Sequence, residues 1–165
     1  MSFQIALLVL SDSRSAGERE DKVIPACQEI LQDTDLHLAH TAIIPDDRQT
    51  IVQELRRLVL NPNVSLVITA GGTGLAPRDN APEATQEVIE RPAPGFAELL
   101  RLKGFEHTPK AMLSRGVAGI AGQTLIINMP GSPKAVREGL GTLLPILPHA
   151  LETLLGMASE CAGGT

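Results

Sequence analysis

A glycine-rich loop, Gly71-Gly72-Thr73-Gly74, follows directly after the apolar run at residues 64–69. Glycines adopt positive φ angles readily and let backbone amides approach a phosphate closely. The loop is not followed by the Gly-Lys-Ser/Thr of a Walker loop, and Pro77 stands where a G-x-G-x-x-G fingerprint requires its last glycine. The pattern therefore indicates either a phosphate cradle or a tight strand-to-helix turn.

Acidic residues stand near this loop and after an earlier apolar run. Asp79 comes shortly after the glycines, beside Arg78, and Asp46 and Asp47 form an acidic pair. An aspartate near a phosphate loop commonly holds Mg²⁺, because this hard cation prefers oxygen ligands. The alternative is helix capping, with Asp79 or Asn80 before one helix and Asp46 or Asp47 before another. Spacing alone leaves both interpretations open.

Two further segments could bind an anion. In the segment Pro130-Gly131-Ser132-Pro133-Lys134, Ser132 can cap a helix whose N-terminus attracts anions, and Lys134 adds positive charge. Ser114-Arg115 pairs a hydroxyl with a guanidinium, which can also bind phosphate. A plain strand-to-helix joint and an exposed loop are the alternatives.

The elements that would position these residues follow from the apolar pattern. Unbroken apolar runs predict strands, and apolar residues at helical spacing predict helices between them. Pro25 is expected to delay or kink the first helix. Strands are predicted at residues 5–10, 36–44, 64–69, 117–120 and 124–128. Helices are predicted at residues 18–32, 49–60, 82–89 and 95–102. A last helical region is predicted from Ser132-Pro133 to Gly156, with breaks at Pro145 and Pro148.

Alternation of strands and helices predicts an α/β fold, with a mostly parallel sheet covered on both faces. A tight turn at Gly122 predicts a hairpin and therefore one antiparallel strand. Such sheets bind ligands at the carboxyl ends of their strands. Ser11-Asp12-Ser13, the glycine-rich loop and the segment from Asn128 to Ser132 all fall at such ends, which is the strongest argument for a site there.

Composition narrows the class of protein. The 165 residues favour a single domain, 1–165, and 43% hydrophobic content favours a packed core. Aromatic residues are only 2% and the net charge is −5, so we expect no nucleic-acid partner. Cys27 and Cys161 form neither a disulfide framework nor a zinc site. Without a signal peptide or a long apolar stretch, we expect a cytoplasmic protein with no membrane partner and a frayed tail from Ala158.

The motifs taken together resemble a known family. LVITAGGTGLAPRDNAPEATQEVIERPAPGF and TPKAMLSRGVAGIAGQTLIINMPGSPKAVREGL are similar to the two signatures of the Mog/MoaB family of molybdenum-cofactor proteins. VLSDSRSAGEREDK and IIPDDRQTI resemble its first helix entry and its acidic turn. The resemblance runs from about Ile5 to about Gly156 and is greatest to the Mog-type enzymes.

The resemblance implies a three-layer α/β/α sandwich that assembles as a homotrimer. It implies transfer of AMP from Mg-ATP to the terminal phosphate of molybdopterin, release of pyrophosphate, and hand-over of the product to a molybdate-inserting protein. Asp46 and Asp79 match the two key acidic residues and are expected to be catalytic and to bind Mg²⁺. The expected ligand-binding residues are Ser11, Gly71, Gly72, Thr73, Gly74, Ser114, Asn128, Pro130, Gly131, Ser132 and Lys134.

Two departures from the family pattern stand at the site. Asn80 and Ala81 replace the usual Val-Thr, so the role of the threonine hydroxyl is lost or is taken by Asn80. The second departure is Ser132, which stands where some members have Asn. Two other functions are open: a non-catalytic MoaB-type molybdopterin-binding protein, and a trimeric scaffold. The presence of both Asp46 and Asp79 argues against the first, and the lack of a linker to a second partner weakens the other.

Overall fold

A six-stranded sheet in the order β2-β1-β3-β6-β5-β4 forms the centre of the molecule. The structure is a computed structural model and describes residues 1–157, so Cys161 and the tail predicted from Ala158 lie outside the described residues. Strands β2, β1, β3 and β6 run parallel, and β5 runs antiparallel to both of its neighbours. The strands are β1 (Phe3–Leu10), β2 (Leu36–Ile44), β3 (Val64–Ala70), β4 (Arg91–Pro92), β5 (Ala118–Ala121) and β6 (Thr124–Met129).

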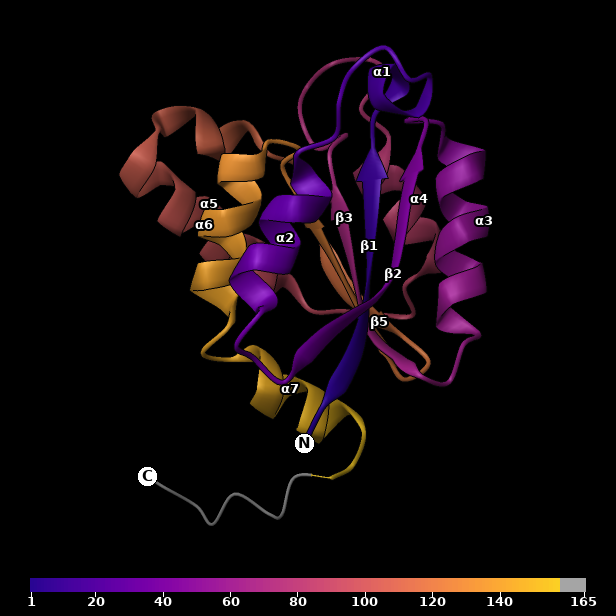
Figure 1. The fold of residues 1–165 in the computed structure, drawn as a ribbon, viewed down its shortest axis with the longest axis vertical. Coiled ribbons are helices and arrows are strands. Elements are labelled where there is room, and N and C mark those ends of the chain that lie inside the picture. Colours follow the sequence, from indigo (N-terminus) through magenta and orange to yellow (C-terminus); the bar gives the residue numbers. More distant parts are fainter. Residues whose placement is uncertain (158–165) are drawn as a thin grey trace.

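Helices cover both faces of this sheet, which confirms the predicted three layers (Figure 1). On one face lie α2 (Val23–Leu31), α5 (Pro94–His107), α6 (Pro133–Leu143) and α7 (Leu147–Leu154); on the other lie α3 (Arg48–Val59) and α4 (Ala81–Val88). The short α1 (Asp12–Ser15) lies at the carboxyl end of β1, and a 3₁₀ helix, η1 (Pro109–Leu113), follows α5. None of the helices in residues 1–157 combines the length and apolarity needed to cross a membrane.

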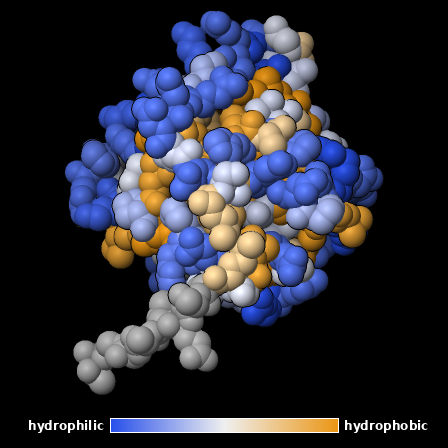
Figure 2. All heavy atoms as spheres, turned by 60° about the horizontal axis from the view of Figure 1, so that its bottom comes forward, coloured by the Kyte–Doolittle hydropathy of each residue, from blue (hydrophilic) through white to orange (hydrophobic). Residues whose placement is uncertain are grey.

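The central strands are buried on both sides because their side chains alternate between two cores. Ile5, Leu7 and Val9 pack with the first helical layer, whereas Ala6 and Leu8 pack with the second. This is the reason that the sequence shows unbroken apolar runs here instead of alternation. Apolar side chains that remain exposed lie in separate patches among charged ones, as the face turned forward in Figure 2 shows.

The first predicted helix, at residues 18–32, begins later than its apolar spacing indicated, which confirms the delayed start expected from Pro25. Helix α2 begins at Val23, because the Asp21 carboxylate accepts hydrogen bonds from the backbone N–H groups of Val23 and Ile24 (3.1 and 2.9 Å). Pro25 therefore stands in the first turn, where its missing N–H costs nothing. The predicted hairpin is confirmed, and the two-residue edge strand β4 and the extension of α5 to His107 were not predicted.

Asn128 is a buried polar residue that joins three parts of the fold. Its Nδ2 donates to Thr69 Oγ1 on β3 (2.9 Å) and to Thr85 Oγ1 on α4 (2.8 Å). Its Oδ1 accepts from the backbone N–H of Val117 (3.1 Å). The amide thus holds β3, β6 and α4 together beneath the glycine-rich loop.

We predict that Asn128→Ala lowers the free energy of unfolding by about 2–4 kcal/mol, because it leaves two buried hydroxyls and one N–H without their partner. Denaturation by urea measures this loss. The control is Asn63→Ala, an exposed asparagine whose side chain makes no hydrogen bond in the described residues. A loss of stability that is no larger for Asn128→Ala than for the control would contradict this role.

Candidate active site

The glycine-rich loop lies at the carboxyl edge of the sheet, packed against oxygens from neighbouring segments. A Cβ atom at Gly72 would lie 2.5 Å from Asp46 Oδ2, and one at Gly74 would lie 2.7 Å from Asp79 Oδ2. Gly71 has a φ of +118° and lies against the carbonyl oxygen of Leu10. The glycines are thus required because carboxylates and a carbonyl occupy the space that side chains would fill.

Asp46 is buried, with 7% of its surface exposed, and contacts on three sides fix its position. Its Oδ1 accepts from the backbone N–H of Asn80 (3.1 Å), and its carbonyl accepts from Asn80 Nδ2 (3.0 Å). Its own N–H donates to Asp12 Oδ1 (3.1 Å). Asn80, which departs from the family pattern, therefore positions Asp46 through both its backbone and its side chain.

Helix capping is assigned to Asp47 and not to Asp46. Asp47 is the N-cap of α3, and its Oδ2 accepts from the N–H of Thr50 (2.9 Å). Asp79 does not cap α4: Asn80 stands at that N-cap, without a side-chain cap bond, and Asp79 Oδ2 accepts from the N–H of Ala76 (3.0 Å). The capping alternative is thus wrong for Asp79, and its carboxylate faces the glycine-rich loop.

The pKa of the Asp46 carboxyl is raised above its usual range, first by burial and then by the negative charges of Asp79 and Asp12. A cation would relieve both effects, and carboxylate oxygens are ligands that Mg²⁺ prefers. No group of three or more His, Cys, Asp and Glu side chains within residues 1–157 could hold a metal ion. Two carboxylates do not complete an octahedral shell, so a Mg²⁺ ion held by Asp46 and Asp79 would take its remaining ligands from water and substrate phosphates.

Arg115 holds the far side of the loop. Its Nε donates to the Gly74 carbonyl (2.8 Å), its second terminal nitrogen donates to the Asp79 carbonyl (2.8 Å), and it forms an ion pair with Glu83. The backbone N–H of Arg115 also donates to Thr73 (2.7 Å). The sequence left Arg115 as either a phosphate ligand or an exposed loop residue, and the structure shows its guanidinium bound to the protein instead.

A pocket of about 350 Å³ opens beside the loop, between α5, η1 and the start of α6. Its walls are mostly apolar, with Leu100, Ala111 and Leu113 among them, and Arg101 is one of the basic residues that line it. Arg101 donates to the Gly116 carbonyl (2.8 Å), which holds α5 against the segment before β5. Sequence reasoning missed Arg101, because its partner is a backbone carbonyl that no motif records.

The predicted site residues divide between this pocket and the acidic side of the loop. Ser132 and Ser114 line the pocket; Ser132 Oγ also caps α6 by accepting from the N–H of Ala135 (3.0 Å), and Ser114 Oγ accepts from Gly116 (3.3 Å). The predicted residues that line it are Thr73, Gly74, Ser114, Asn128, Pro130 and Ser132.

The other predicted residues lie outside that wall. Gly131 packs on Gly71, since a Cβ there would lie 2.9 Å from Gly71 Cα. Ser11 caps α1 by accepting from the N–H of Arg14 (3.2 Å). Lys134 is exposed and its Nζ lies 3.8 Å from Glu138 Oε1, so the structure does not bring it into the pocket wall. The ligand contacts expected for all these residues stay predictions.

This fold and this arrangement of loops are shared with known proteins. Residues 6–149 match the family described as a probable molybdopterin binding domain, and the chain belongs to that family. The chain is 40% identical to a molybdopterin adenylyltransferase of Helicobacter pylori over 94% of this chain and 89% of the relative. It is 43% identical to the molybdopterin adenylyltransferase of Escherichia coli K12, over 84% of this chain and 72% of the relative.

Solved structures agree with these relatives. The chain is 47% identical to the molybdopterin biosynthesis enzyme MoaB of Thermus thermophilus, with a TM-score of 0.88 over 93% of this chain and 97% of that one. A structure of MogA gives a TM-score of 0.85 at 38% identity, over 92% of this chain and 99% of that one. The resemblance noted from the motifs is therefore confirmed along nearly the whole chain.

We predict that Asp46→Asn raises the melting temperature at pH 7 by about 2–4 °C, equivalent to about 1 kcal/mol at this chain length. The pKa of Asp46 is higher in the folded protein than in the unfolded chain, so the folded protein holds the Asp46 proton to a higher pH. As pH rises through the range between these two pKa values, the carboxyl lowers the stability of the folded protein. The variant should lose its advantage near pH 3, where Asp46 is protonated in both states.

Thermal scans without metal or nucleotide at the two pH values measure the difference. Asp47→Asn is the matched control: hydrogen bonds from Thr50 hold the pKa of Asp47 below its usual range, so its replacement should not raise the melting temperature. An Asp46→Asn variant with an unchanged or lower melting temperature at pH 7 would show that the ionised carboxylate is not strained.

Proposed function

We propose that this chain is a molybdopterin adenylyltransferase of molybdenum-cofactor biosynthesis. It transfers AMP from ATP to the terminal phosphate of molybdopterin and releases pyrophosphate. The observation that carries the proposal is the placement of Asp46 and Asp79 against Gly72 and Gly74, beside the pocket. Relatives named for this activity, at 40% and 43% identity, support it.

The reaction needs positioning and charge neutralisation more than proton transfer. A phosphate monoester carries about −1.5 to −2 charges at pH 7, so the nucleophile needs little help from a base. Rate enhancement then comes from holding the attacking phosphate in line with the α-phosphate of ATP and from stabilising the developing charge.

The two sides of the loop divide this work. The pocket lined by Thr73, Ser114 and Ser132 is concave and mostly apolar with a few polar groups, which suits a pterin and its phosphate. On the other side, Asp46 and Asp79 would hold Mg²⁺, which neutralises phosphate oxygens when it is bound. The glycine-rich backbone would then stand between the two substrates.

The alternative is a MoaB-type protein that binds molybdopterin without turning over ATP. Incubation of the purified chain with molybdopterin, ATP and Mg²⁺ separates the two functions. Formation of adenylyl-molybdopterin and pyrophosphate supports the enzyme, and molybdopterin binding without either product supports the alternative.

The proposal also covers the oligomeric state, the partner protein and the cellular location. We propose a homotrimer that hands its product to a molybdate-inserting protein, as the family resemblance implies. A cytoplasmic location belongs to the same proposal.

We predict that Asp79→Asn reduces adenylyl transfer at least about 100-fold, because it removes a charge from the site of Mg²⁺ and phosphate. The fold should persist, since Asn retains an oxygen that can accept from Ala76. Single-turnover rates and melting temperatures on the same preparation measure both effects. Asp47→Asn is the control, since that residue caps α3 and should leave turnover nearly unchanged.

A variant Asp79→Asn with near-wild-type turnover would exclude a catalytic role for this carboxylate. We expect Asp46→Ala to slow the chemical step more than it weakens molybdopterin binding, since a residue that serves the metal acts mainly in the transition state. Weaker molybdopterin affinity with an unchanged chemical step would place Asp46 on the other substrate.

We also predict a homotrimer at micromolar concentration, measured by sedimentation equilibrium. Exposed Leu102, Phe105, Met112 and Leu113 on α5 and η1 supply apolar surface for such contacts. A single species with the mass of one chain, 17.5 kDa, would rule the trimer out.

A further inference from the structure

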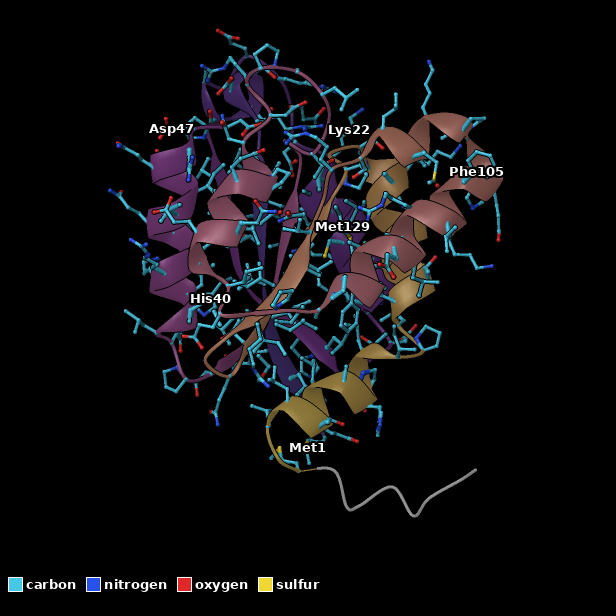
Figure 3. All side chains as sticks on the ribbon, turned by 180° about the vertical axis from the view of Figure 1, so that it is seen from behind. Met1, Lys22, His40, Asp47, Phe105 and Met129 are labelled. Carbon is cyan, nitrogen blue, oxygen red and sulfur yellow. The ribbon has the colours of Figure 1, made fainter. Side chains whose placement is uncertain are left out.

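A second hollow, of about 290 Å³, lies between the loop after α1 and the start of α6. Arg14, Arg19 and Lys22 line it, together with Glu20 and Pro133. Figure 3 shows Lys22 at the same end of the molecule as Asp47, which is the end opposite Met1. The hollow therefore lies at the carboxyl edge of the sheet, and its lining carries three basic residues and one acidic residue.

Arg14 is the unusual member of this lining. Its side chain is 94% buried (6% exposed), and its Nε has no hydrogen-bond partner within residues 1–157. The nearest carboxylate oxygen, Asp21 Oδ1, lies 3.7 Å away, which is too far for a hydrogen bond. Both Asp21 oxygens already accept from the N–H groups that begin α2.

A buried guanidinium nitrogen without a hydrogen bond is costly, and such a nitrogen is normally satisfied by an acceptor. Here the protein supplies none to Nε, while Arg19 and Lys22 add exposed positive charge at the same hollow. A tetrahedral oxyanion offers several acceptors and negative charge, and Arg is well suited to bind it.

We propose that this hollow is an oxyanion subsite that binds the β- and γ-phosphates of ATP and then the leaving pyrophosphate, an inference that rests on the proposed function. Two of its residues stand close in the chain to residues of the site. Arg14 is two residues after Asp12, which accepts from the N–H of Asp46, and Pro133 directly follows Ser132 of the pocket.

The chemistry assigns a clear task to such a subsite. An oxygen of the molybdopterin phosphate forms a bond to the α-phosphorus of ATP, and the bond from that phosphorus to the bridging β-oxygen breaks. The electron pair of the broken bond stays on the bridging oxygen, so the charge on pyrophosphate increases. Guanidinium and ammonium groups at the hollow stabilise that charge as it develops.

Calorimetric titration with sodium pyrophosphate tests the subsite without turnover. We expect the Arg19→Ala, Lys22→Ala double variant and, separately, Arg14→Met to lose at least about tenfold in pyrophosphate affinity, because each removes charge-assisted hydrogen bonds. Their affinities for AMP and molybdopterin should stay within about twofold of the wild type. Arg91→Ala, which removes an exposed charge on β4, should bind pyrophosphate as the wild type does.

Melting temperatures separate this role from a structural one. Arg14→Met should lower the melting temperature only modestly, because Asp21, which loses its ion-pair partner at 3.7 Å, keeps the hydrogen bonds from the backbone N–H groups of Val23 and Ile24. A large fall in melting temperature with unchanged pyrophosphate affinity would overturn the proposal and show that Arg14 serves its ion pair with Asp21. Lost molybdopterin affinity with retained pyrophosphate affinity would also overturn it, by assigning the hollow to the other phosphate.

The subsite and the proposed function can fail separately. A wild type that forms adenylyl-molybdopterin but binds pyrophosphate equally well in every variant would overturn the subsite alone. Arg14-dependent binding in a protein that forms no adenylyl-molybdopterin would overturn the proposed function, and with it the assignment of this hollow to ATP.

Discussion

The packing of two carboxylates against two glycines is the constraint on which the site depends. Asp46 and Asp79 occupy the space beside Gly72 and Gly74, where a Cβ atom would lie 2.5 and 2.7 Å from their oxygens. Any side chain there would displace a carboxylate. The parallel register that places Val9 opposite Ala70 keeps Leu10 beside Gly71, so the sheet itself sets this spacing.

Much of the fold could be predicted because buried parallel strands have an unmistakable pattern. Strands β1 and β3 are buried on both faces and mostly apolar, and their predicted positions agree with the structure to within two residues. Strand β4 could not be predicted, since Arg91 and Pro92 become a strand only by pairing with β5. Helix α2 starts late for a local reason: the carboxylate of Asp21 accepts the hydrogen bonds of the first N–H groups, and residues 18–22 before the helix are all charged.

The site was harder to predict than the fold. Sequence spacing could place Asp46 and Asp47 after the same strand, but it could not tell which of them caps the next helix. Side chains of adjacent residues in extended backbone point to opposite sides, and spacing alone does not say which side faces the site. The structure assigns the cap to Asp47 and burial to Asp46. Arg101 and Arg115 escaped a correct assignment because their partners are backbone carbonyls, and any residue type supplies those.

Hydrogen bonding distinguishes the buried polar side chains that support the fold from those that are candidates for binding a ligand. Three hydrogen bonds occupy the amide of Asn128, so its side chain serves the fold as it stands. Asn80 is similarly occupied by Asp46 and by the carbonyl of Arg78. Arg14 is the opposite case, because its burial is not matched by hydrogen bonds to Nε.

The two edges of the sheet differ in a way that bears on aggregation. Strand β4 is two residues long and contains a proline, so it offers almost no template for another strand. The other edge, β2, extends over nine residues from Leu36 to Ile44 and contains no proline. Partly unfolded chains that associate through strand pairing should therefore do so along β2, and a lysine introduced on the exposed side of that strand is the simplest protection for the purified protein during storage.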